Sequence, residues 1–172
     1  VYNVAVGYNS GTAVTTGTAN TFIGGRAGDA TTTGSTNVAV GTDALGSNTT
    51  ASNNVAIGYD CLVANTTGAT NTALGTSSLA TNTTASNNTA VGHGALTANT
   101  TGTRNNALGN LSLVANTTGD NNVALGSQTL QANTTADDNT AVGYAALNVN
   151  TTGANNTAVG KFAGLAVTTG GY

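Results

Sequence analysis

The sequence predicts an all-β fold, a parallel β-solenoid (β-roll) of ten 17-residue rungs, and three observations carry this prediction. Glycine recurs at every seventeenth residue from Gly7 to Gly160 with no insertion, and such a period marks a stack of like structural units. Seventeen residues are too few for a helix pair, whose repeats span ~33–47 residues. Gly, Thr and Asn at fixed intervals also disfavour helix.

Each rung is numbered here from its first Asn, which places the recurring Gly at position 5. The consensus is N-x-A-[VIL]-G-x-x-a-L-x-x-N-T-T-[GA]-x-x. Asn at position 1, Gly at position 5 and Thr at positions 13 and 14 are the same in all ten rungs. Most of the charged residues and tyrosines lie at the variable positions 6, 7, 10, 16 and 17. We expect the constant columns to pack or turn and the variable columns to face solvent or partners.

The first five positions of each rung, as in residues 54–58, alternate as a β-strand does. Positions 2 and 4 then share one face, and position 3 takes the other. We expect the aliphatic residue at position 4 and the Leu at position 9 to form a thin core. Gly at position 5 and Gly or Ala at position 15 predict corners. Each rung then holds two or three short strands.

Stacking turns each position into a column of like side chains. Rungs about 4.7–4.9 Å apart give ten rungs a length of roughly 50 Å, and stacked Asn side chains can hydrogen-bond along the axis. We expect the Asn and Thr ladders and the Gly corners to hold rung on rung, and the position-9 Leu to hold each rung together. The structural columns are the position-1 Asn (Asn54, Asn71, Asn88, Asn105), the position-5 Gly (Gly58, Gly75, Gly92, Gly109) and the position-9 Leu (Leu62, Leu79, Leu96, Leu113).

The composition argues against several classes of function. Thr, Ala, Asn and Gly supply 114 of the 172 residues, and charged residues only 5%. Arg26, Arg104 and Lys161 are too far apart to track a nucleic-acid backbone. With one His, one Cys and no Glu, we expect no catalytic, metal or cofactor site. No apolar run approaches the ~20 residues of a membrane span.

A few residues could have a reactive, metal-binding or glycosylation role and are considered in turn. Cys61 at position 8 is expected to be a small buried filler beside Leu62, with an intermolecular disulfide as the alternative. His93 at position 6 is expected to be a solvated surface residue. Asp120 and Asp137 do not recur in every rung, as calcium-binding β-rolls require. The Asn-Thr-Thr segments match the N-x-[ST] glycosylation pattern, but we favour a structural turn, with sugar on outward Thr or Asn left open.

The ends of the chain predict further stacking. The sequence starts at position 16 with Val1 and stops at position 17 with Tyr172, with no distinct cap and no signal peptide. We therefore expect residues 1–172 to form one solenoid domain that continues or stacks at both ends. The outer rungs differ at position 9 and position 12, through Gly11, Gly28, Gly164, Val14 and Val167. True capping by these changes is the alternative.

The segment Asn53-Asn54-Val55-Ala56-Ile57-Gly58 resembles the N-S-V-A-I-G motif of YadA-type trimeric adhesin heads. The resemblance implies a left-handed β-roll and a trimer, with Val55 and Ile57 pointing inward and Gly58 at the corner. The full unit, as in residues 139–153, is similar to repeat arrays in bacterial surface proteins and phage tail-fibre-like proteins. We therefore expect a non-enzymatic extracellular fibre segment or adhesin on a cell surface or virion. Its partner would be itself, as a trimer or head-to-tail filament, with a host surface or glycan left open.

A second resemblance supports an alternative. N-x-V-x-G repeats also resemble β-roll ice-binding proteins, in which flat Thr ladders form the binding surface. Asn at position 12 and Thr at position 14 would share one strand face and form two ladders. The candidate ice or glycan surface is the position-14 column: Thr50, Thr67, Thr84, Thr101, Thr118, Thr135 and Thr152. The adjacent Thr at position 13 cannot lie on the same strand face. The position-14 column therefore lacks the Thr-x-Thr pair that is favoured on ice-binding surfaces.

Overall fold

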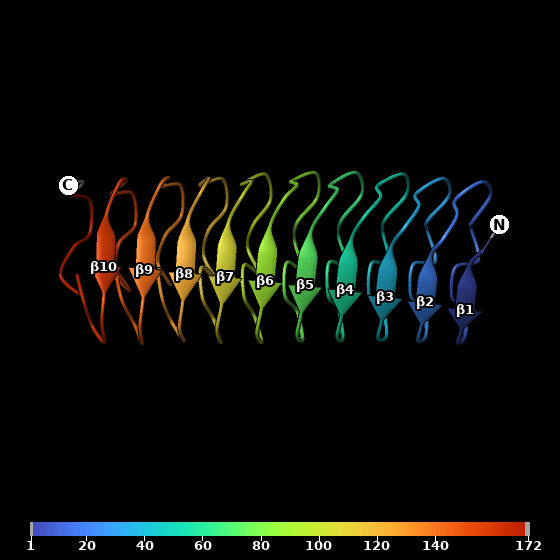
Figure 1. Ribbon diagram of the computed structural model, residues 1–172, viewed down its shortest axis with the longest axis horizontal. Helices are drawn as coiled ribbons and strands as arrows, with labels where there is room; N and C mark the ends of the chain where they lie inside the picture. The colour runs from blue at the N-terminus through green and yellow to red at the C-terminus, as the bar shows by residue number, and fades with distance from the viewer. Residues whose placement is uncertain (1, 171–172) are drawn as a thin grey trace.

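The computed structural model describes residues 2–170 and confirms the parallel β-solenoid. Ten strands lie side by side in sequence order, all parallel, with the two ends of the chain at opposite ends of the rod (Figure 1). The expected domain of residues 1–172 is therefore described except at Val1, Gly171 and Tyr172, which lie outside these residues. The strands are β1 (Val4–Val6), β2 (Thr21–Ile23), β3 (Val38–Val40), β4 (Val55–Ile57), β5 (Thr72–Leu74), β6 (Thr89–Val91), β7 (Asn106–Leu108), β8 (Val123–Leu125), β9 (Thr140–Val142) and β10 (Thr157–Val159).

Each rung holds one three-residue strand at positions 2–4, so the expectation of two or three strands was wrong. The reason lies in the backbone, which takes positive φ at positions 7 and 9 in every rung and at position 17 in the nine rungs where that residue is described. These conformations interrupt extended chain. Rungs are nevertheless joined outside the sheet, as where the Thr66 amide donates to the Thr83 carbonyl at 2.8 Å.

The strand faces are the reverse of those expected. Ala56, the middle residue of β4, is fully buried, whereas Val55 and Ile57 on the opposite face are half-buried. Leu74 and Leu108 at position 4 are 44% and 40% exposed. The prediction that position 4 forms the core was therefore wrong. Where position 9 is Leu, this side chain and the buried Asn side chains fill the interior, and position 3 is always Ala.

The position-9 leucines form the second half of the core. All seven, from Leu45 to Leu147, are at most 1% exposed and adopt φ of 47° to 55°. Positive φ is uncommon for a bulky residue and costs roughly 1–3 kcal/mol. Such a conformation persists only when its surroundings determine it, and here burial in the rung interior does so.

The position-5 glycines mark a corner where successive rungs touch. Gly58 has φ of 136°, and a Cβ there would lie 2.8 Å from the backbone of Gly75 in the next rung. The constant Gly column therefore reflects both the backbone conformation and the close approach of rungs.

Candidate functional site

The position-1 asparagines join neighbouring rungs through their side chains. Asn54 Oδ1 accepts the backbone N–H of Asn71 at 2.9 Å, and Asn54 Nδ2 donates to the Gly68 carbonyl at 2.9 Å. The amide-to-Oδ1 bond recurs at all nine junctions between the ten rungs. All of these side chains except that of the half-buried Asn3 are buried, so the bonds also satisfy groups that water cannot reach. Asn71, Asn88 and Asn105 occupy equivalent places.

The position-12 asparagines form a second buried ladder, this time between side-chain amides. Asn82 Nδ2 donates to Asn65 Oδ1 at 2.9 Å. Asn65 Nδ2 also donates to the Gly68 carbonyl, the same oxygen that Asn54 reaches from position 1. Two donors use both lone pairs of one carbonyl oxygen. Since position 12 is buried, the expected surface shared by Asn at position 12 and Thr at position 14 does not exist.

The two constant Thr columns have different environments. Thr100 at position 13 is half-buried, and its hydroxyl donates to the Thr117 carbonyl of the next rung at 3.0 Å. The position-14 threonines, among them Thr50, Thr101 and Thr152, are exposed in all ten rungs. Within residues 2–170 no hydrogen bond is formed by their hydroxyls. The hydroxyl at position 13 thus joins neighbouring rungs, whereas within the described residues the hydroxyl at position 14 faces solvent without a partner in the fold.

This difference predicts unequal effects of removing the two hydroxyls. We expect Thr100→Val to lower the free energy of unfolding by about 0.5–1.5 kcal/mol, because a half-buried hydrogen bond is lost. Thr101→Val, which removes an exposed hydroxyl from the adjacent residue, should change it by less than about 0.5 kcal/mol. Urea unfolding of both variants measures the difference, and equal losses would show that position 14 also supports the stack.

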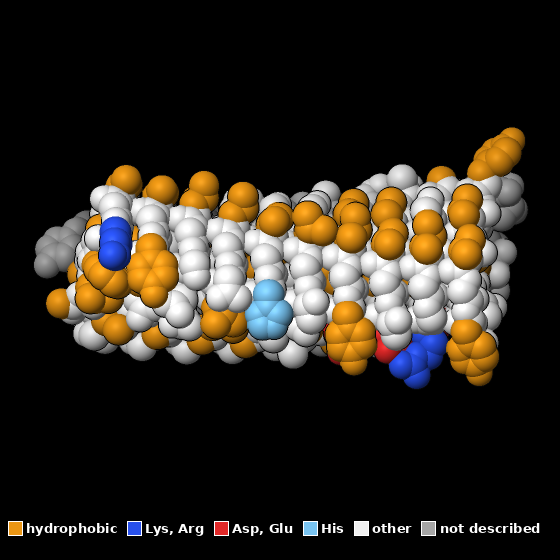
Figure 2. All heavy atoms as spheres, turned by 90° about the horizontal axis from the view of Figure 1, so that it is seen from below, with side chains coloured by type: hydrophobic (Ala, Val, Ile, Leu, Met, Phe, Trp, Pro, Cys, Tyr) orange, Lys and Arg blue, Asp and Glu red, His pale blue; other side chains and the backbone are white. Residues whose placement is uncertain are grey.

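The outward side chains of position 4 form an exposed aliphatic row, which we call the strand-face row. Hydrophobic side chains follow the rod from end to end along one edge (Figure 2). Sequence reasoning placed these residues inside because their hydrophobicity is high. The most exposed members are Val6, Ile23, Leu74, Leu108, Leu125 and Val159.

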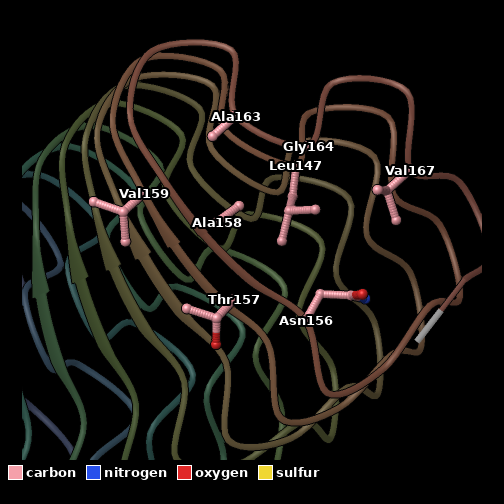
Figure 3. A pocket seen from close by; sticks show the side chains of 8 residues that line it. All are labelled: Leu147, Asn156, Thr157, Ala158, Val159, Ala163, Gly164 and Val167. Carbon is pink, nitrogen blue, oxygen red and sulfur yellow. The ribbon is translucent and has the colours of Figure 1, made fainter. Parts of the chain in front are cut away.

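The C-terminal end of the rod presents an open interior. Gly164 and Val167 replace the usual Leu and Asn, and a hollow of about 400 Å³ opens there. The side chains of Leu147, Ala158 and Val167 line it (Figure 3). Sequence reasoning noted these replacements but did not relate them to a hollow.

Cys61 is the buried filler that was expected. It is fully buried, and its Sγ lies 2.9 Å from Ser78 Oγ of the next rung. Burial raises the pKa of the thiol above its ordinary value, because a thiolate would lose its hydration. A disulfide to another chain would require this rung to open.

The raised pKa predicts a loss of stability in alkali. Because the thiol resists ionisation when folded, its contribution is complete below the ordinary thiol pKa of about 8.5 and is lost as pH rises towards the folded-state pKa. We expect the unfolding midpoint of the native chain to fall more steeply above this pH than that of Cys61→Ala, a residue found at position 8 of other rungs. Thermal melts from pH 7 to 10 measure this, and parallel curves would contradict it.

The charged residues serve the stack or face solvent. Asp120 Oδ1 accepts the Thr103 N–H at 2.6 Å, and Asp137 Oδ1 accepts the Asp120 N–H at 2.7 Å. Arg26 pairs with Asp43 of the next rung, which raises the pKa of its guanidinium. His93 is exposed. Within residues 2–170 no three His, Cys, Asp or Glu side chains gather where a metal ion could bind.

The Asn ladders join the rungs into a rod of stacked repeats. The surface of the rod consists of columns of side chains, each column formed by one position of the repeat. Among the described residues, no helix has the length and apolar character needed to cross a membrane. No family model, curated protein or solved structure gives a significant match to this chain.

Proposed function

We propose that the chain is a non-enzymatic structural or adhesive segment of an extracellular fibre, which self-associates through stacked β-rungs. The observation that carries the proposal is Asn156 Oδ1. It is the one side-chain oxygen or nitrogen that is buried and lacks a hydrogen-bond partner in residues 2–170. In each of the nine earlier rungs the same atom accepts the N–H of the next rung. The final rung therefore has an unused acceptor for one more.

The strand face alone offers a small area for lateral packing. Ten strands spaced ~4.8 Å apart, each three residues of ~3.3 Å long, give a face of roughly 480 Å². A stable interface buries about 800 Å² per partner. The strand-face row can therefore align copies side by side, as a trimer for example, but it is too small to form a stable interface by itself.

The resemblance to bacterial surface and tail-fibre-like arrays supports a location on a cell surface or a virion fibre. In such a rod the variable positions 6 and 7, which hold Tyr59, Asp60 and His93, recur in columns on the outside. Side chains that recur along the outside of a rod suit a host surface or a glycan as the binding partner.

Sedimentation velocity and negative-stain microscopy over increasing concentration test the proposal. We expect rods of constant width that exceed the ~50 Å length of one chain. Thr157→Pro should shorten them, because it removes an N–H that in earlier rungs donates to the next rung, as Thr140 does to Asn156. The double variant Leu108→Glu and Leu125→Glu should separate bundles without shortening rods. Monomers at every concentration would overturn the proposal.

Ice binding on the position-14 column is a second candidate. It is favoured by ten exposed threonines at a fixed spacing whose hydroxyls form no hydrogen bond within the described residues. Ice recrystallisation and thermal hysteresis assays test it. Activity should fall in Thr84→Tyr and Thr101→Tyr but not in the control Thr76→Tyr, since Tyr59 and Tyr144 already occupy position 6 elsewhere. A native chain without effect on ice growth would exclude this candidate.

A further inference from the structure

The solenoid contains its own example of how a missing core leucine is replaced. Gly11 and Gly28 stand at position 9 of the first two rungs, where seven other rungs have Leu. Phe22, at a position that is otherwise Ala, fills the space of both. A Cβ at Gly11 would lie 2.8 Å from Phe22 Cδ2, and one at Gly28 would lie 2.6 Å from Phe22 Cε1. Phe22 is 1% exposed.

The third position-9 glycine, Gly164, has no aromatic residue among its nearest neighbours. A Cβ there would lie 2.7 Å from Leu147 Cδ2 of the preceding rung and 3.5 Å from Ala158 Cβ of its own rung, so its nearest neighbours are aliphatic and come from the inner side. The hollow of about 400 Å³ therefore lies over Gly164 (Figure 3). In the first two rungs, the residue that fills the space over Gly11 comes from the following rung.

A second, independent feature at the same end indicates which backbone group an occupant would present. Asn156 is 3% exposed and lines the hollow. Its Oδ1 has no partner, while its Nδ2 donates to Asn139 Oδ1 at 2.9 Å. In every earlier rung this oxygen accepts the N–H at position 1 of the following rung, so the missing group is a backbone N–H in that register.

We propose that the C-terminal end is a socket for an adjoining rung of this repeat with an aromatic residue at position 3. Its position-1 N–H donates to Asn156 Oδ1, and its ring occupies the hollow over Gly164 as Phe22 does over Gly11. This rests on the proposed function, in which rungs stack beyond the tenth. The first rung of a second copy has Ala5 at position 3. It would satisfy Asn156 but leave the hollow unfilled, and is therefore the weaker occupant.

The test extends the full chain after Tyr172 by a copy of residues 20–53, which continues the 17-residue register and encloses the added Phe. The matched control is the same extension with that Phe changed to Ala. We expect the Phe version to unfold at least about 5 °C higher, since a Phe-to-Ala change in a core is large. Leu147 methyl resonances should also shift upfield through the ring current in the Phe version alone.

The Gly164→Leu background completes the design. A leucine fills the hollow from within the tenth rung, so the advantage of the Phe extension over the Ala extension should shrink to what the ring contributes over the copied Gly28. Equal melting temperatures of the two extensions on the native background, with unchanged Leu147 methyl shifts, would overturn the socket. If hydrogen exchange shows the added residues unprotected in both extensions, rungs do not continue past the tenth. That result would overturn the proposed function as well.

Discussion

Gly92→Ala should destabilise the solenoid by about 2–6 kcal/mol. Gly92 has φ of 130°, and a Cβ there would lie 2.6 Å from the Gly109 carbonyl oxygen of the next rung. The backbone conformation alone costs an L-residue roughly 1–3 kcal/mol. Forcing the rungs apart adds a further cost of about 1–3 kcal/mol, as in an overpacked core. Equilibrium urea unfolding measures the sum.

Gly160→Ala is the matched control for this substitution. Gly160 has nearly the same φ, 127°, but a Cβ there would meet only Ala163 Cβ at 4.0 Å. The control should therefore show the conformational cost of about 1–3 kcal/mol without the collision. A loss at Gly160 equal to that at Gly92 would mean that contact between rungs does not explain the glycine column.

Leu113→Ala and Leu108→Ala are expected to differ strongly although both lie in the seventh rung. Leu113 at position 9 is fully buried, whereas Leu108 at position 4 is 40% exposed. Loss of a buried leucine costs about 2–5 kcal/mol because a cavity remains. The exposed leucine should cost less than about 1 kcal/mol, because much of its area already faces water.

The same pair tests which strand face is inside. Differential scanning calorimetry on both variants gives the ranking directly. If Leu108→Ala were the more damaging change, position 4 would face the core, as the hydrophobic pattern alone suggests. If association of chains contributes to stability, the effect of Leu108→Ala should grow with protein concentration, and that of Leu113→Ala should not.

The period allowed the architecture to be predicted, because a fixed 17-residue spacing leaves one way to stack equivalent residues. The Gly corner and the Asn and Leu columns were placed by the same argument. Which strand face is buried could not be predicted in this way. Val and Ile are more hydrophobic than Ala, but it is Ala56 that shares the buried cluster with Leu62. The positive φ of the buried leucines is likewise known only from the folded rung.

Other features could have been found from the sequence and were missed. Phe22 is the single departure from Ala at position 3, and it occurs where position 9 is Gly in its own and in the preceding rung. A compensating pair of this kind is visible without a structure. The same comparison shows that Gly164 lacks its compensating aromatic. The different roles of the two Thr columns could not be separated, because both are constant.

The length of each rung determines how the chain responds to a force along the rod axis. Each rung occupies about 4.8 Å of the stacked rod, yet its 17 residues can extend to roughly 60 Å at ~3.5 Å per residue. A rung that detaches therefore releases more than ten times its stacked length while the remaining rungs keep their own contacts. Under load the rod yields in discrete steps, and so can absorb work without breaking its covalent chain.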